Sequence, residues 1–343
     1  MTISVLIPCY NEEKTIRACL ESVLLQTRPA DQIVVVNDGS TDGTAAILDE
    51  YRTRAIVVRT PLNTGNKSYA QEYGLQFVSG DIFVTTDADT LLSPDFLERI
   101  EKDFENPRVE AVAGYVRSMK NNWLTACREL DYLIGQDLHK RAQARLNAVL
   151  VIPGAAGAFR RRTFQKHISF DHDTVTEDLD FTYKYHHHEF KVLFDTKAIV
   201  YTQDPFTLHS YVHQMRRWVG GGWQNLIKHW RIILRRPGHA AEIGFVYVEG
   251  TVFGLLFFVL PLINIYYFFA FFSGYFVIGG ILGAWGAIAR RRFDLLFYAP
   301  LFPIVLVLNS VIFFEQFVKE IIFRRRSVSW FKPLRKNILP LNV

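Results

Sequence analysis

The chain has 343 residues, which suits one soluble domain of about 200 to 240 residues plus an appendage. Its 39 Lys and Arg exceed its 34 Asp and Glu, giving a formal net charge of +5. The surplus arginine falls in short clusters, none of them inside a recognisable nucleic-acid-binding module. We therefore expect membrane lipids and an anionic small substrate as partners, and no nucleic acid. Cys9, Cys19 and Cys127 lack paired spacing, which indicates reduced cytosolic thiols and argues against a zinc site.

The N-terminal part alternates short apolar runs with helical patterns. Strands are predicted at residues 3–8, 32–38, 55–60 and 81–89, and helices at residues 12–26, 42–52 and 67–78. This rhythm is typical of an α/β domain with a mostly parallel sheet covered on both faces. Ligands of such sheets bind at the carboxyl ends of the strands. No signal-peptide pattern occurs at the start, so we expect this domain to stay in the cytosol.

Polar side chains follow three of the predicted strands. Pro8, Tyr10 and Glu12 come at the end of the first strand, Asp38 after the second, and Asp87 and Asp89 after the fourth. Residues i and i+2 of an extended chain point to the same side, so Asp87 and Asp89 can face one hard divalent cation. Taken alone, a solvated turn explains such a pair equally well. Neither GxGxxG nor GxxxxGK[ST] occurs, so the sequence lacks the motifs of dinucleotide-binding and P-loop proteins.

The stretches SVLIPCYNEE, VVVNDGSTD and TTDAD resemble the motifs of family 2 glycosyltransferases, in the same order. The resemblance extends over about residues 3–218 and implies a nucleotide-sugar-binding domain of the GT-A type. It implies that Asp38 holds the nucleotide, that Asp87 and Asp89 hold the diphosphate and a Mg²⁺ or Mn²⁺ ion, and that the opening motif lines the substrate site. The NTGNK stretch would put Lys67 near the phosphates, although a solvated helix start is an open alternative.

A second set of site residues follows further along the chain. A sugar hydroxyl needs a base to attack an anomeric carbon, and a carboxylate at a helix start can serve. In the resembling family the aspartate of the Thr-Glu-Asp motif is that base, which implies Asp178 as a catalytic residue beside Glu177. For Glu177, a helix N-terminal charge favoured by the macrodipole is an equal alternative. The stretch from Val151 resembles the acceptor segment of chitin and poly-N-acetylglucosamine synthases, with Gly154 against the sugar.

The stretch QMRRW matches the QxxRW motif of processive cellulose, chitin, hyaluronan and poly-N-acetylglucosamine synthases. By that resemblance Gln214, Arg217 and Trp218 form the acceptor end of the site, and an indole face packs well on a pyranose. We therefore predict a membrane-bound inverting glycosyltransferase that extends a β-linked polysaccharide from a UDP-sugar, with N-acetylglucosamine favoured.

Two alternatives stay open at this point. One is transfer of a single sugar to a polyprenyl phosphate or another lipid acceptor. The other is a non-catalytic membrane scaffold, which is disfavoured because every motif residue is present. No predicted membrane segment precedes the catalytic domain, so translocation of a polymer would call for a small membrane partner or a homo-oligomer.

The C-terminal part reads as membrane-embedded. Residues 250–289 contain no charged side chain over 40 positions. A helical run of this length can cross a bilayer twice, or cross once and continue as a helix along the membrane surface. A second uncharged run covers residues 295–314, despite Pro300 and Pro303. We predict a cytosolic catalytic domain at 1–205, interfacial helices at 206–242, a transmembrane region of two to three spans at 243–323 and a basic tail at 324–343. The predicted location is the plasma membrane.

The arginine clusters constrain the number of crossings. A hairpin over residues 250–289 returns residues 290–292 to the cytosol, as the positive-inside tendency requires. A third crossing would then put the cluster at residues 324–326 outside, against the same tendency. We therefore predict that the basic tail is cytosolic and that the number of full crossings is even.

Overall fold

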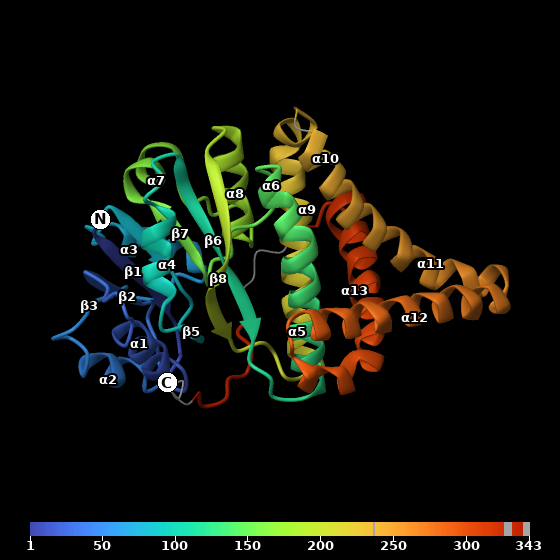
Figure 1. Cartoon of the computed structure of the whole chain (residues 1–343), viewed down its shortest axis with the longest axis horizontal. Coiled ribbons are helices and arrows are strands. Elements are labelled where there is room, and N and C mark those ends of the chain that lie inside the picture. Colours follow the sequence, from blue (N-terminus) through green and yellow to red (C-terminus); the bar gives the residue numbers. More distant parts are fainter. Residues whose placement is uncertain (236, 326–330, 339–343) are drawn as a thin grey trace. The chain divides into compact units, whose positions relative to one another are not determined.

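The computed structural model describes residues 1–235, 237–325 and 331–338 (Figure 1). The chain divides into two compact units: the first holds Met1–Arg117, Ala144–Gln203 and Leu334–Val343, and the second holds Ser118–Gln143 and Asp204–Pro333. Residues 118–143 thus group with the helical unit, and residues 334–338 of the predicted tail group with the sheet. The boundaries given from the sequence remain predictions. Arg236 and Arg326, members of two predicted basic clusters, lie outside the described residues.

The first unit is built on an eight-stranded mixed sheet with the order β3-β2-β1-β4-β7-β6-β8-β5. The strands are β1 (Ile3–Cys9), β2 (Gln32–Asn37), β3 (Ile56–Arg59), β4 (Ile82–Thr85), β5 (Thr90–Leu92), β6 (Val109–Ser118), β7 (Gly157–Arg160) and β8 (Lys191–Thr202). The run β3-β2-β1-β4 is parallel, whereas β7 pairs antiparallel with β4 and β6, and β5 pairs antiparallel with β8. Every residue of β1 and β4 is buried, as apolar strands covered on both faces require. The predicted α/β fold is confirmed, and the antiparallel half adds to it.

Helices alternate with these strands as predicted, with shorter bounds. They are α1 (Ile16–Leu24), α2 (Thr44–Asp49), α3 (Lys67–Leu75), α4 (Phe96–Asp103), α7 (Arg161–His167) and α8 (Glu177–His187). The first begins later than expected because Asn11 has a left-handed φ of 52° and Thr15 turns back to the Glu12 carbonyl at 3.0 Å. At α3 the Asn66 side chain accepts a hydrogen bond from the Ser68 amide at 3.1 Å, which caps the helix. Both α1 and α3 therefore begin just beyond a polar turn that follows a strand.

The second unit is helical throughout its regular elements. These are α5 (Trp123–Ile134), η1 (Gly135–Lys140), α6 (Arg141–Arg145), α9 (Leu208–Arg235), α10 (Pro237–Ile243), η2 (Gly244–Val248), α11 (Glu249–Ile263), α12 (Ile265–Ala289), η3 (Phe293–Leu301), α13 (Phe302–Phe317) and η4 (Val318–Ile322). Three stretches of the described chain are long and apolar enough to cross a membrane: Gly244–Ile263, Ile265–Ala289 and Phe293–Ile322.

The long uncharged run forms a helical hairpin (Figure 1). It breaks at Asn264, whose side chain accepts from the Tyr266 amide at 2.8 Å and so caps α12. Pro303 lies in the first turn of α13, where a missing N–H costs no helical hydrogen bond. The two helices of the hairpin match the predicted alternative in which this run folds back on itself.

Polar pairs join α9 to α13 and to η4, which continues from it. They are Tyr211 Oη to Asn309 Oδ1 at 2.8 Å, Arg216 Nε to Glu315 Oε1 at 3.0 Å, and Gln224 Nε2 to Glu320 Oε2 at 3.3 Å. Residue numbers rise together in the two helices, so they run parallel. The glycines at 220–222 continue α9 without a break, and a Cβ on Gly220 would lie 3.0 Å from Gln316 Oε1. These glycines therefore allow close packing against an unbroken helix.

Packing of α11 on α13 depends on Gly254. An added Cβ there would collide with the Ser310 carbonyl and lie 2.7 Å from Phe314 Cβ, whereas at Gly274 in α12 no atom lies within 4 Å. We expect Gly254→Val to destabilise the second unit by about 1 to 3 kcal/mol through overpacking. Thermal unfolding in detergent should show a lowered midpoint for Gly254→Val and an almost unchanged one for Gly274→Val. Equal midpoints for both variants would contradict this packing.

Candidate active site

The polar residues predicted at strand ends lie at one edge of the sheet, because β2, β1 and β4 are parallel neighbours. The loops after β1 and β2 are tied together there. Asn11 Oδ1 accepts from the Thr41 amide at 2.7 Å, and the Asn11 amide donates to Ser40 Oγ at 3.0 Å. Tyr10 lies half-buried beside this link, while Pro8 lies inside β1 opposite Val36.

Asp38 follows β2 and is 5% exposed. Its carboxylate accepts hydrogen bonds from Thr60 Oγ1 at 2.8 Å, from Thr64 Oγ1 at 2.8 Å and the Thr64 amide at 3.1 Å, and from Asn63 Nδ2 at 3.2 Å. These donors use the roughly four acceptor positions that a carboxylate offers. Asp38 thus fastens the loop that leads to α3, a contact that its motif did not predict.

Lys67 joins the two halves of the predicted site. Its Nζ lies 2.5 Å from Asp87 Oδ1 and 3.4 Å from Glu177 Oε1. Burial favours the neutral amine, but Asp87 and Glu177 outweigh it and raise the pKa of Lys67, so the ammonium is charged at neutral pH. A Cβ added to Gly154 would lie 2.8 Å from Lys67 Nζ and 3.6 Å from Glu177 Oε1. The glycine therefore leaves room for this buried cation and its carboxylates.

Asp178 lies in the first turn of α8, beside the same glycine. Its Oδ1 accepts from the Leu179 amide at 2.9 Å, and the Gly154 amide lies 3.5 Å from its Oδ2. The side chain is half-buried, whereas neighbouring Glu177 is 7% exposed. The first turn of a helix also favours the ionised form through the macrodipole. Asp178 is thus the more accessible carboxylate of the pair.

Asp89 is paired with a residue from the far end of the chain. The Arg335 guanidinium forms a close ion pair with Asp89 Oδ2, and Arg335 Nε lies 3.8 Å from Glu12 Oε1. Burial raises the pKa of Asp89 to about 6, because burial together with Glu12 and Asp87 exceeds the opposing effect of Arg335. Glu12 itself is fixed by Thr15 Oγ1, which donates to its carboxylate at 2.6 Å.

Asp87 and Asp89 remain the predicted ligands of a Mg²⁺ or Mn²⁺ ion. Asp87, Asp89 and Glu12 offer hard carboxylate oxygens, and these ions prefer such ligands. A guanidinium already holds the place of a cation against Asp89 and Glu12. Among the described residues, the three carboxylates that lie within 4.8 Å of one another are a different group, Asp171, Asp173 and Asp180.

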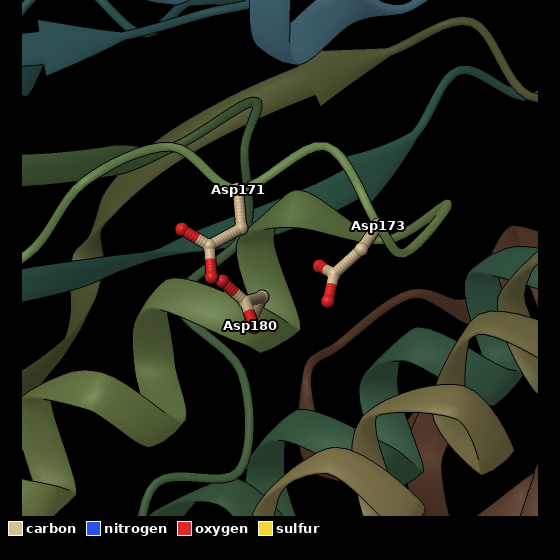
Figure 2. Close-up of side chains that lie close together, drawn as sticks. All are labelled: Asp171, Asp173 and Asp180. Carbon is tan, nitrogen blue, oxygen red and sulfur yellow. The ribbon is translucent and has the colours of Figure 1, made fainter.

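A separate group of carboxylates lies beside α8, where Asp171, Asp173 and Asp180 point toward one another (Figure 2). The Lys184 ammonium lies 2.6 Å from Asp171 Oδ1 and 3.0 Å from Asp180 Oδ2. This group already has its cation in Lys184. The neighbouring histidines are not ligands of one ion, since His186 is buried while His187 and His188 are exposed.

The QxxRW residues lie in α9, which belongs to the second unit, whereas the other predicted site residues belong to the first. There, the Trp218 ring lies 4.5 Å from the Arg128 guanidinium, which also stacks on Tyr132 at 4.6 Å. Gln214 and Arg217 are half-buried on the same helix. The roles assigned to these three residues from their motif remain predictions.

Sequence reasoning missed two arginines. Arg128 is 3% exposed and is anchored by Asp131 at 2.5 Å. No motif in the sequence pointed to it. Arg335 belongs to the basic tail, whose positive charge predicted only that the tail is cytosolic.

Comparison with known proteins gives the family of the first unit. Residues 4–168 match the family described as Glycosyl transferase family 2, so the chain contains a glycosyltransferase domain of that family. Poly-beta-1,6-N-acetyl-D-glucosamine synthase of Staphylococcus epidermidis is 30% identical over 230 residues, which cover 66% of this chain and 56% of that protein. Hyaluronan synthase of Streptococcus pyogenes is 29% identical over 254 residues, covering 68% and 60%. The chain thus spans little more than half the length of these relatives.

Solved structures agree on the fold. Mannosyltransferase PcManGT from Pyrobaculum calidifontis, in complex with GDP-Man and Mn²⁺, has a TM-score of 0.67 at 21% identity, covering 94% of this chain and 88% of that one. S. aureus TarS 1-349 in complex with UDP-GlcNAc has a TM-score of 0.51 at 17% identity, covering 93% and 92%. At these identities the likeness concerns the GT-A fold alone.

The loop fastened by Asp38 gives a test of the site's construction. Gly39 has a φ of +67°, and a Cβ there would collide with the Asn63 amide and lie 2.7 Å from the Leu62 carbonyl carbon. Gly65 has a φ of +74° with no atom within 4 Å. We expect Gly65→Ala to cost about 1 kcal/mol of backbone strain and Gly39→Ala to cost more, because the loop must move. Thermal unfolding of both variants measures the difference, and equal shifts would contradict the close approach.

Proposed function

We propose that the chain is a membrane-bound inverting glycosyltransferase that adds a sugar from a UDP-sugar to the end of a growing β-linked polysaccharide. The observation that carries this proposal is the cluster of Asp87, Lys67, Glu177 and Asp178 around Gly154 in a family 2 glycosyltransferase domain. N-acetylglucosamine is the favoured sugar, because one relative is named as a polymer synthase of that sugar and TarS is solved with UDP-GlcNAc.

Three residues of the cluster have a chemical part in the proposed reaction. Asp178 takes the proton of the acceptor hydroxyl while the oxygen attacks the anomeric carbon. The bond from that carbon to the diphosphate breaks in the same displacement, and its electron pair leaves with the UDP. The Lys67 ammonium, held by Asp87, lies ready to offset the charge of the departing phosphates.

Asp87, Asp89 and Glu12 would hold a Mg²⁺ or Mn²⁺ ion in this function. The bound ion would supply Lewis-acid neutralisation of the diphosphate. PcManGT, whose fold this chain shares, is solved with Mn²⁺ and GDP-Man. Trp218 and Gln214 would contact the acceptor, as the QxxRW resemblance implies.

A direct test incubates membranes containing the chain with labelled nucleotide sugars and a divalent ion. Polymer that is digested by a linkage-specific β-glycosidase supports the proposal. If the product is instead a single sugar on an extractable lipid, the polymer hypothesis is wrong and the lipid-acceptor alternative is supported. Absence of transfer from every donor would overturn both.

The proposed membrane arrangement has two full crossings, α11 and α12. Residues 118–143 leave the first unit and return to it, so they stay on the catalytic side. Arg290 pairs with Asp137 at 2.5 Å and Arg292 pairs with Glu129 at 2.9 Å, which supports a hairpin that ends on that side. The stretch Phe293–Ile322 then begins there, and residues 334–338 belong to the first unit. An even number of crossings follows, with the catalytic side cytosolic.

We expect Asp178→Asn to reduce turnover by about two to four powers of ten, the usual effect of losing a positioned base, while donor binding stays almost unchanged. Transfer rates and UDP titration of the purified full chain measure the two quantities. Asp173→Asn is a matched control, because Asp173 is exposed and lies five positions earlier. Parallel loss of binding and turnover in Asp178→Asn would assign that residue a different role.

The topology is tested by Ser329→Cys in a variant that lacks the three native cysteines. Ser329 lies outside the described residues but between two segments of the proposed cytosolic side. We expect a membrane-impermeant thiol reagent to label it only after the cells are permeabilised. Labelling in intact cells would restore a third crossing.

A further inference from the structure

His172 links two elements of the candidate active site. It belongs to the loop of residues 168–176, which joins α7 to α8. Its Nδ1 lies 2.8 Å from Ser68 Oγ, and its Nε2 lies 3.0 Å from Glu72 Oε2. An ionised carboxylate can only accept, so Nε2 donates to Glu72, and Nδ1 of the neutral ring accepts from the Ser68 hydroxyl. One imidazole thus connects this loop to two positions of α3.

The imidazole of His172 is also held on its face. Tyr69 stacks on it, with the ring centroids 3.5 Å apart and the ring planes 16° from parallel. The His172 side chain is 22% exposed, and Ser68 is fully buried. Two hydrogen bonds and a stacking contact, all from α3, fix both the place and the rotation of the ring. The imidazole is therefore anchored, whereas His187 of α8 is exposed.

The residue before His172 ties the same loop to α8. Asp171 Oδ1 lies 2.6 Å from the Lys184 ammonium, and Figure 2 shows Asp171 pointing toward Asp180 of the same helix. The Lys184 ammonium lies 3.0 Å from Asp180 Oδ2 and also 3.0 Å from the Ser169 carbonyl oxygen. Neighbouring side chains of the loop therefore face different helices: Asp171 contacts α8, and His172 contacts α3.

These contacts lie beside the starts of both helices. Lys67 is the first residue of α3 and comes directly before Ser68, while Glu177 is the first residue of α8. Lys67 Nζ lies 3.4 Å from Glu177 Oε1, across the gap between the two helix starts. The width of that gap sets where the ammonium lies relative to Asp178. His172 bridges the same two elements from the loop, so it helps to set this width.

We propose that His172 is a positioning residue for the sugar transfer: by holding the start of α3, it keeps the Lys67 ammonium where the departing diphosphate needs it. His172 acts through Ser68, the residue next to Lys67, and does not itself touch the substrate. This inference rests on the proposed function, which supplies the diphosphate. A charge stabilises a transition state best when it is preorganised, and a displacement of about 1 Å can reduce a rate by about a hundredfold.

The two ring nitrogens allow a graded test by substitution. His172→Asn retains a polar atom close to the Nδ1 position, which faces Ser68, whereas His172→Gln retains one close to the Nε2 position, which faces Glu72. We expect His172→Gln to lower kcat by about ten- to a hundredfold. His172→Asn should restore most of that loss, because the Ser68 contact lies beside Lys67. Transfer rates of the full chain in membranes measure both variants.

The donor KM should change less than kcat in His172→Gln. The charge that Lys67 offsets develops as the diphosphate departs, so its correct placement matters mainly in the transition state. His187→Gln is the matched control, since it makes the same substitution at an exposed histidine and should keep the wild-type kcat. A wild-type kcat in His172→Gln would overturn the proposal. Equal losses in His172→Asn and His172→Gln would also overturn it, because the Ser68 contact would then not decide the rate.

Binding of UDP to the full chain in detergent, with EDTA present, tests the positioning without any sugar transfer. Free UDP carries the charge that departure creates, so it reports on the Lys67 ammonium. We expect Ser68→Ala and His172→Gln each to weaken UDP binding about two- to tenfold, the usual effect of one lost hydrogen bond. Adding either change to Lys67→Gln should weaken binding no further, because both residues act through Lys67. Additive losses would give them a role independent of Lys67 and overturn the proposal.

Thermal unfolding shows which variants are folded. If His172→Gln is not, Ser68→Ala carries both measurements, because it removes the same hydrogen bond from the other partner and leaves the contact between His172 and Glu72 in place.

The two proposals fail in distinguishable ways. Absence of sugar transfer by the wild type, together with non-additive UDP binding, would remove the proposed reaction and keep the positioning role of His172. Normal transfer, together with additive UDP binding or a wild-type kcat in His172→Gln, would remove the positioning role and keep the reaction. Absence of UDP binding by the wild type would overturn both.

Discussion

Carboxylates crowd together where three parallel strands end, and their mutual repulsion is the constraint on which the site depends. Glu12, Asp87 and Asp89 are close enough for the first two to raise the pKa of the third, and Glu177 faces Lys67 from α8. Unpaired charges with so little exposure would be costly. Two buried cations compensate this charge: Lys67 pairs with Asp87, and Arg335 pairs with Asp89.

The same need for partners shapes the helical unit. Glu129 is fully buried, yet it accepts from the Ser118 amide at 2.7 Å and pairs with Arg292. Arg290, from the same cluster, pairs with Asp137. The arginines after α12 therefore do more than follow the positive-inside tendency, since they satisfy carboxylates of a helix whose two ends return to the sheet unit. In the proposed membrane arrangement, every chain connection between the two units lies on the cytosolic side, and this limits which apolar helices cross the membrane.

The sequence allowed good prediction wherever local pattern and burial agree. The β-branched runs of β1, β2 and β4 gave strands, their parallel order followed from the helices between them, and the polar ends fell at one edge as expected. The antiparallel half was not foreseen, because β5 has only three residues and β7 only four, too few to show a period. Asp38 was placed correctly, but its saturation by the 60–64 loop depends on tertiary contacts. Arg335 was read as a surface charge, since nothing in a basic tail indicates which carboxylate it will meet.

The two cations differ in how firmly the fold holds them, and that difference orders the site before any ligand binds. Lys67 is fixed by α3 and lies between Asp87 and Glu177, so this side of the site is preorganised, which is where electrostatic stabilisation is most effective. Arg335 comes from residues 331–338, which form no helix or strand, and the backbone of its neighbour Lys336 is hydrogen-bonded to the Gln203 side chain. The asymmetry between the two aspartates thus follows from chain connectivity, because one partner lies in a packed helix and the other in an extended segment.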